Sequence, residues 1–254
     1  MEQHTPQRLL SRLDAIGRSL AERADALALI ALGSAGREPE RLDAWSDLDF
    51  FVIVQPGAKT RFIEDLSWLA AARPLAWHLR NTADGHKALM DDGVFCEFAV
   101  FTRDELAPVP FAPGRLVWRR DGVDESIAMP QRALPRPSTD ETWIVGEALA
   151  ALLVGLSRWR RGEKLSAMRL VQGAALDRLA ELDALRTRPP GGDPFNPERR
   201  LEQRQPALAG ELPRLAPGYE HTPAAARALL EALRARGALL NAAVVAHIEA
   251  LAAV

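Results

Sequence analysis

The sequence predicts an α+β fold for the first half of the chain and an all-α fold for the second half. Short runs rich in β-branched and aromatic residues alternate with helical patterns as far as Arg119, and none follows it. Between the halves lies a proline-rich crossing that argues against a continuous helix: Pro108, Pro110, Pro113, Pro130, Pro135 and Pro137. The predicted domains are therefore residues 1–135 and 136–254.

The first half is predicted to begin with a helix and to continue with strands. Leu9, Leu13 and Ile16 recur at helical spacing, which predicts an amphipathic helix over residues 5–24. Another helical pattern covers residues 61–72. Strands are predicted for the apolar runs at 26–32, 47–54, 75–79, 93–101 and 116–119.

The second half is predicted to be helical throughout. A capping box of Ser138 with Glu141 would open a long helix over residues 138–161. In this helix Glu147 shares an apolar stripe with Trp143, which favours a partly buried ion pair over an acid facing a cleft. Further helices are predicted over 165–185, within the proline-rich stretch 189–217, and over 224–251.

Composition narrows the classes of function. The 254 residues include 32 Lys plus Arg and 34 Asp plus Glu, a net charge of −2, so we expect no nucleic acid polymer as partner. The single Cys96 excludes an internal disulfide framework and a cysteine-based zinc site. No apolar stretch approaches the ~20 residues of a membrane span, and the N-terminus lacks a signal-peptide apolar block. We expect a cytoplasmic protein without a membrane partner.

Two carboxylates begin the strand predicted at residues 47–54. Side chains alternate between the faces of a strand, so Asp47 and Asp49 point the same way. Neighbouring carboxylates repel each other unless a cation lies between them. Mg²⁺ is typically held by one or two carboxylates together with substrate phosphates. The pair is therefore a candidate Mg²⁺ site.

Two further features accompany the acids. The apolar run 26–32 ends in Gly33 and Ser34, which permit a tight turn whose N–H groups and hydroxyl could hold phosphate oxygens. Glu97 lies in an otherwise apolar strand, where a carboxylate is costly unless it meets a metal, a cation or water. Each feature alone usually has no functional role and is either a surface acid or a simple turn. Their combination favours a functional site.

The stretch GSAGREPERLDAWSDLDFFVIV, residues 33–54, resembles the signature of the polymerase-β-like nucleotidyltransferase superfamily. Within it the chain is most similar to the small antibiotic nucleotidyltransferases, first the lincosamide enzymes and then the aminoglycoside adenylyltransferases. The resemblance to the lincosamide enzymes includes SDLDF, FCEFAVF, FTRDEL and WRRGEKLSAMRL, and it fades from about Arg186 onward. It implies an N-terminal nucleotidyltransferase domain, with a small mixed β-sheet flanked by helices, and a helical domain behind it.

The resemblance implies transfer of a nucleoside monophosphate from an NTP, the co-substrate, to a hydroxyl group, with release of pyrophosphate. Asp47 and Asp49 match the metal-binding acids, with two Mg²⁺ ions expected, and Gly33 with Ser34 matches the triphosphate-binding turn. Glu97 matches the third acid, which either shares a metal or acts as general base toward the acceptor. The sequence leaves both roles open, and we favour the base.

Three basic residues are candidates for nucleotide binding. Arg37 follows the turn and is as well placed for a phosphate as for solvent. Arg161 and Lys164 belong to a basic group in the second half, where a solvated face is the usual outcome, but the family's helical domain commonly closes over the nucleotide. Trp45, just before the acids, is a candidate for stacking on a base or an acceptor ring and equally for core packing.

The expected acceptor is a small hydroxyl-bearing molecule, plausibly a lincosamide or aminoglycoside antibiotic, which would make the protein an antibiotic-resistance enzyme. Two alternatives stay open: transfer of AMP to a protein partner, as in regulatory or antitoxin-type members, and a non-catalytic nucleotide-binding module. The presence of Asp47, Asp49 and Glu97 counts against the module. The family also suggests a homodimer.

Overall fold

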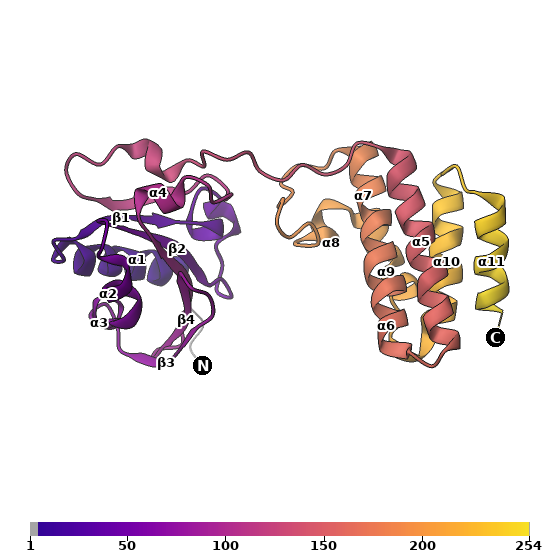
Figure 1. Ribbon diagram of the computed structural model, residues 1–254, viewed down its shortest axis with the longest axis horizontal. Coiled ribbons are helices and arrows are strands. Elements are labelled where there is room, and N and C mark those ends of the chain that lie inside the picture. The colour runs from indigo at the N-terminus through magenta and orange to yellow at the C-terminus, as the bar shows by residue number, and fades with distance from the viewer. Residues whose placement is uncertain (1–4, 254) are drawn as a thin grey trace. The chain divides into compact units, whose positions relative to one another are not determined.

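The computed structural model describes residues 5–253, which form two compact units divided between Leu134 and Pro135 (Figure 1). The first unit holds a β-sheet with flanking helices, and the second, as far as Ala253, holds helices and no strand. The predicted α+β half followed by an all-α half is therefore confirmed. No helix within residues 5–253 is both long and apolar enough to span a membrane.

The sheet has six strands in the order β3-β4-β5-β2-β1-β6. Their bounds are β1 (Ala26–Ala31), β2 (Leu48–Val54), β3 (Leu75–Arg80), β4 (Gly85–Met90), β5 (Phe95–Phe101) and β6 (Arg115–Arg119). Only β2 and β5 pair in parallel, and the other neighbours are antiparallel, so the sheet is mixed as expected. The parallel pair at the centre brings the starts of β2 and β5 to the same edge.

Strand β4 was not predicted. Its sequence, GHKALM, contains no β-branched or large aromatic residue, and lysine, alanine, leucine and methionine are good helix formers. Pairing with β3 on one side and β5 on the other overrides that preference. Its buried side chains, among them Ala88 and Met90, join the main core of the unit.

Each face of the sheet carries its own apolar cluster. The larger one packs α1 (Pro6–Ala21), α2 (Lys59–Glu64) and α3 (Ser67–Ala70) against one face, through buried residues such as Ile16, Trp68, Phe50 and Phe98. A smaller cluster on the other face includes Phe101 and Phe111, with Leu106 from α4 (Arg103–Leu106). The second face is therefore covered only in part.

The second unit packs around one long helix, α5 (Glu141–Arg160), which contacts α7, α10 and α11. The chain continues through α6 (Lys164–Met168), a π-helical segment (Arg169–Ala175), α7 (Leu176–Thr187), α8 (Leu201–Arg204), α9 (Pro206–Leu215), α10 (Thr222–Ala235) and α11 (Ala242–Ala252).

Two details of α5 correct the sequence predictions. Its N-cap is Asp140, whose side chain accepts from the backbone N–H of Trp143, so the predicted Ser138 capping box is wrong. Ser138 instead accepts a hydrogen bond from the N–H of Asp140. Glu147 is exposed rather than partly buried, because α5 turns Ile144, Ala148 and Leu152 toward the core.

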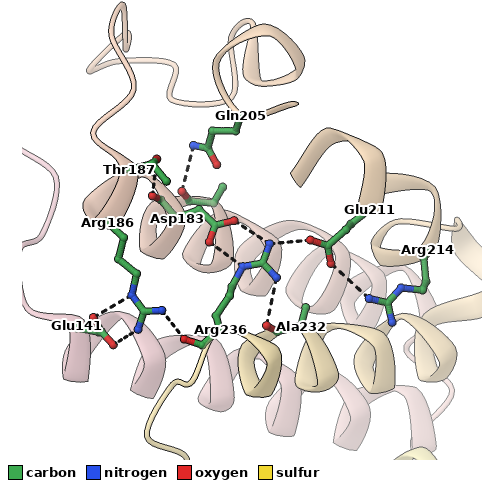
Figure 2. Close-up of polar contacts among 10 residues, drawn as sticks. Glu141, Asp183, Arg186, Thr187, Gln205, Glu211, Arg214, Ala232 and Arg236 are labelled. Atoms are coloured by element: carbon green, nitrogen blue, oxygen red, sulfur yellow. Dashed lines mark hydrogen bonds and ion pairs between the residues drawn. The ribbon is translucent and has the colours of Figure 1, made fainter. Parts of the chain in front are cut away.

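A network of arginines and acids ties the helices of the second unit together (Figure 2). The guanidinium of Arg236 donates to both carboxylate oxygens of Asp183, at 2.7 and 2.8 Å, and to Glu211 at 2.8 Å. These contacts raise the pKa of Arg236 above its ordinary value. A second pair, Arg186 with Glu141, joins α7 to the start of α5.

Candidate active site

Asp49 and Glu97 are register partners on the parallel strands β2 and β5. Directly paired residues of neighbouring strands project from the same face of a sheet. This is the face opposite α1, α2 and α3, because the intervening residues Leu48 and Cys96 belong to the core beneath those helices. Both acids are partly exposed, so the sheet presents two adjacent carboxylates at an accessible edge.

Asp47 precedes the first residue of β2 and lies two positions before Asp49. It follows a closed turn in which Asp43 accepts hydrogen bonds from the N–H of Trp45, at 2.9 Å, and from the hydroxyl of Ser46, at 3.1 Å. The turn leaves the Trp45 side chain 78% exposed. Core packing of Trp45 is therefore excluded, and its aromatic face lies in solvent near the acids along the chain.

The Gly-Ser turn lies directly against Asp49. Gly33 has a φ of +54°, a conformation that L side chains rarely adopt, and a Cβ built there would lie 3.3 Å from Oδ2 of Asp49. The backbone N–H of Leu32 also donates to the carbonyl of Asp49, at 2.8 Å. Residues Gly33–Ala35 form a short 3₁₀ helix in which Ser34 is buried. The predicted phosphate-binding turn and metal acid thus meet at one edge.

Two arginines hold this turn to the neighbouring β6 region. Nε of Arg115 donates to the carbonyl of Ala35, at 3.0 Å, and Nε of Arg37 donates to the carbonyl of Gly114, at 2.9 Å. Arg37 is exposed beyond that contact, as a phosphate-binding role requires. Arg115 was missed by the sequence analysis, because a single arginine in a strand carries no local signal. Its Nη2 is buried and has no hydrogen-bond partner within residues 5–253.

Glu97 has polar partners on its other side. Its Oε1 accepts from the amide nitrogen of Asn81, at 3.1 Å, and its Oε2 lies 3.1 Å from Nζ of Lys87. Lys87 is the register partner of Glu97 on β4. Both partners escaped sequence reasoning because the β3–β4 hairpin was not predicted: Lys87 is on β4, and Asn81 lies in the connection from β3 to β4. They hold the carboxylate while leaving the Glu97 side chain 43% exposed.

The donor set fits a Mg²⁺ ion bound by two carboxylates together with substrate oxygens. Within residues 5–253, no three His, Cys, Asp or Glu side chains gather closely enough to hold a metal by themselves. That arrangement is compatible with Mg²⁺, which usually keeps waters and takes phosphate oxygens beside one or two carboxylates. Asp47 and Asp49 supply such a pair, and Glu97, the register partner of Asp49, lies beside it with Asn81 and Lys87 in contact with its carboxylate.

Arg161 and Lys164 belong to the second unit. Arg161 pairs with Glu163 at 3.2 Å, and Lys164 pairs with Glu220 at 2.9 Å. Nζ of Lys164 also lies 4.9 Å from the centre of the Trp159 ring. Both cations are at the surface, and their contact with a nucleotide remains a prediction.

No family model and no curated protein matches this sequence. Among solved structures, the chain is similar to an aminoglycoside 6-adenyltransferase from Bacillus subtilis, with 12% identity and a TM-score of 0.36 over 99% of this chain and 100% of that one. It is also similar to the CD-NTase CdnG of Bradyrhizobium diazoefficiens in complex with GTP, with 13% identity and a TM-score of 0.30 over 92% and 96%. Both superpositions are weak, so the function of this chain has to be inferred from its own residues.

Proposed function

We propose that this protein is a Mg²⁺-dependent nucleotidyltransferase that moves a nucleoside monophosphate from an NTP to a hydroxyl group of a small acceptor. The observation that carries the proposal is the meeting of three motif elements at one sheet edge. Asp49 has Glu97 as its register partner on one side, and Gly33 in contact range of its carboxylate on the other. Acids and a glycine turn on separate surfaces would not support this chemistry.

Asp47 and Asp49 would hold Mg²⁺ in this assignment, and Glu97 would act mainly as the general base, with the metal as a second contact. Bound Mg²⁺ would neutralise charge on the phosphates during transfer. The turn at Gly33 and Ser34 would offer N–H groups to the triphosphate, with Arg37 as a cation beside it.

Glu97 would take the proton of the acceptor hydroxyl. The acceptor oxygen then forms the new bond to the α-phosphorus, and the bond from that phosphorus to the pyrophosphate oxygen breaks. Asn81 and Lys87 would fix the direction of the Glu97 carboxylate. Orientation of this kind contributes to rate because the reacting groups are already placed.

The candidate acceptors are lincosamide and aminoglycoside antibiotics, which would make antibiotic resistance the biological role. The test is pyrophosphate release with Mg²⁺ and each NTP in turn, with a lincosamide, an aminoglycoside or buffer alone. Release that depends on one acceptor, with a mass increase of one nucleotide on that compound, would establish the class and the substrate together.

Two other outcomes would favour the alternative functions. NTP binding without transfer to any compound, together with a nucleotide on a protein, would indicate a protein AMP-transferase. NTP binding that is unaffected by Mg²⁺ and by Asp49→Asn, with no turnover, would indicate a non-catalytic nucleotide-binding module.

A further inference from the structure

Arg115 begins strand β6 beside the turn at Gly33–Ala35. It is the register partner of Ala31, the last residue of β1, so its backbone adjoins the point where the turn starts. The residue before it, Gly114, permits this approach, because a Cβ there would collide with Cγ2 of Ile30. The side chain of Arg115 therefore reaches the turn from a strand whose position the sheet fixes.

The turn depends on an outside contact to keep one conformation. Two of the four residues 33–36 are glycines, whose backbone has more freedom than that of other residues. Nε of Arg115 donates to the carbonyl of Ala35, at 3.0 Å. Because a peptide group is planar, a fixed Ala35 carbonyl also fixes the direction of the Gly36 N–H. That N–H donates to the carbonyl of Gly33, at 3.0 Å, so the contact with Arg115 is transmitted to the start of the turn.

The start of the turn touches the proposed metal acid. A Cβ at Gly33 would lie 3.3 Å from Oδ2 of Asp49, and the N–H of Leu32 donates to the carbonyl of Asp49, at 2.8 Å. A turn that changes its conformation would therefore move relative to Asp49. Binding of a metal-bound triphosphate needs the turn and the acid in place together.

The charge of Arg115 has no acid to neutralise it. Arg119, at the end of the same strand, pairs with Glu125 at 2.9 Å, whereas no carboxylate within residues 5–253 forms an ion pair with Arg115. Its Nη2 is buried and, among the described residues, has no hydrogen-bond partner. A buried donor without a partner lowers stability, so a gain in stability does not account for the guanidinium. A cation without an acid favours an anion nearby.

We propose that Arg115 is a positioning residue for the nucleotide. Its Nε holds the turn at Gly33–Ala35 in the conformation that takes the triphosphate, and its unneutralised charge favours that anion. Arg115 acts through the turn, in contrast to Arg37, which is exposed beside it. This proposal rests on the proposed nucleotidyltransferase function, because the turn must receive the phosphates of an NTP.

The first experiment needs no nucleotide. Hydrogen exchange of the Leu32 and Gly36 amides, measured by NMR in the full chain, reports the conformation of the turn. Arg115→Met removes the donor and should make both amides exchange faster. Arg115→Gln should leave their exchange unchanged, because Nε2 of glutamine lies as many bonds from the backbone as Nε of arginine. Unchanged exchange in Arg115→Met, or equally fast exchange in both variants, would overturn the proposal.

The second experiment measures the Kd of each Mg²⁺-bound NTP by titration calorimetry in the same proteins. Arg115→Met should raise the Kd for the NTP that binds tightest about tenfold or more, because both the placement of the turn and the charge are lost. Arg115→Gln loses the charge alone and should raise it about threefold. A Kd in Arg115→Met equal to that of the wild type would overturn the proposal.

Arg120→Met is the matched control. Nε of Arg120 also donates to a main-chain carbonyl, that of Ala26 at 2.8 Å, but at the opposite end of β1 from the turn. This variant should lower the Tm and leave both the Kd and the exchange of the turn amides unchanged. If it raises the Kd as much as Arg115→Met does, Arg115 contributes only to the stability of the first unit, and its positioning role is refuted.

Failure of the proposed function has a separate signature. A wild-type protein that binds none of the Mg²⁺-bound NTPs would refute the nucleotidyltransferase function, and the role of Arg115 toward a nucleotide would fall with it. A wild-type protein that binds one of them, with the same Kd in Arg115→Met, would refute the role of Arg115 alone.

Discussion

Gly33 and Asp49 lie so close that a methyl group on the glycine would touch the carboxylate: a Cβ at position 33 would be 3.3 Å from Oδ2. Gly33 also has a φ of +54°, which costs a residue with a side chain about 1 kcal/mol. We therefore predict that Gly33→Ala loses about 1 kcal/mol of stability and most of its transferase activity, because the turn or the acid must move. Denaturant unfolding and pyrophosphate release measure the two effects.

Gly122→Ala is the matched control for that variant. Gly122 has a φ of +79°, but a Cβ there would meet no atom within 4 Å. It should show a similar loss of stability with activity retained. Equal losses of activity in the two variants would mean that the approach of Gly33 to Asp49 has no functional role.

The Asp49→Asn variant removes the negative charge of the side chain and keeps its size. The amide is nearly the same size as the carboxylate, so the sheet should remain intact, while a metal ligand is lost. We predict unchanged circular dichroism and a loss of transfer of at least a thousandfold, a magnitude comparable with loss of a major charge-stabilising group. Asp91→Asn serves as control, because Asp91 is a surface partner of Arg73. Full activity of Asp49→Asn would refute the metal assignment.

The central part of the site could be predicted from sequence because its signal is local. Asp47 and Asp49 flank the first residue of β2, and Gly33 follows the end of β1, so the residue pattern alone identifies them. Predicting that Glu97 belongs to the site also requires the parallel pairing of β2 with β5, because this pairing places Glu97 beside Asp49. The resemblance to the nucleotidyltransferase superfamily assigns Glu97 to the site, whereas the spacing of residues along the chain does not.

The partners of the site could not be predicted, because they depend on contacts between distant segments. Lys87 reaches Glu97 only through β4, a strand whose composition favours a helix and whose pairing decides its structure. Arg115 reaches Ala35 from 80 residues away in sequence. The start of α5 shows the same limit at short range, since Ser138 and Asp140 are both good caps and packing selects Asp140.

His86 should make the first unit less stable in mild acid. Burial, with His78 and Arg80 nearby, lowers the pKa of His86 below the ordinary value of 6.5. Below pH 6.5 the unfolded chain binds a proton that the folded chain refuses, so stability falls until the folded-state pKa is passed. His86→Phe should remove this loss, since Phe98 already stacks on the ring at a centroid distance of 5.7 Å.

Denaturant unfolding of the wild type and of His86→Phe between pH 5 and 8 measures the effect. The slope of the free energy of unfolding against pH should be smaller in the variant. His221→Phe is the control, because His221 is exposed in the second unit and its replacement should leave the slope as in the wild type. Parallel slopes for His86→Phe and the wild type would mean that His86 does not become protonated on unfolding.

Arg236 should be the most sensitive charged position of the second unit. Its side chain is 15% exposed and joins α10 to Asp183 on α7 and Glu211 on α9 (Figure 2). Arg236→Met would leave Asp183 without this cation and Glu211 with only the exposed Arg214, and we predict a loss of about 2 kcal/mol, between the values for exposed and buried pairs. Arg214→Met is the control, because Arg214 also contacts Glu211 but is 51% exposed, and it should lose less than about 1 kcal/mol. Hydrogen exchange of the α7 and α10 amides measures both effects within this unit. Equal protection in the two variants would show that the Arg236 network adds no more than a surface pair.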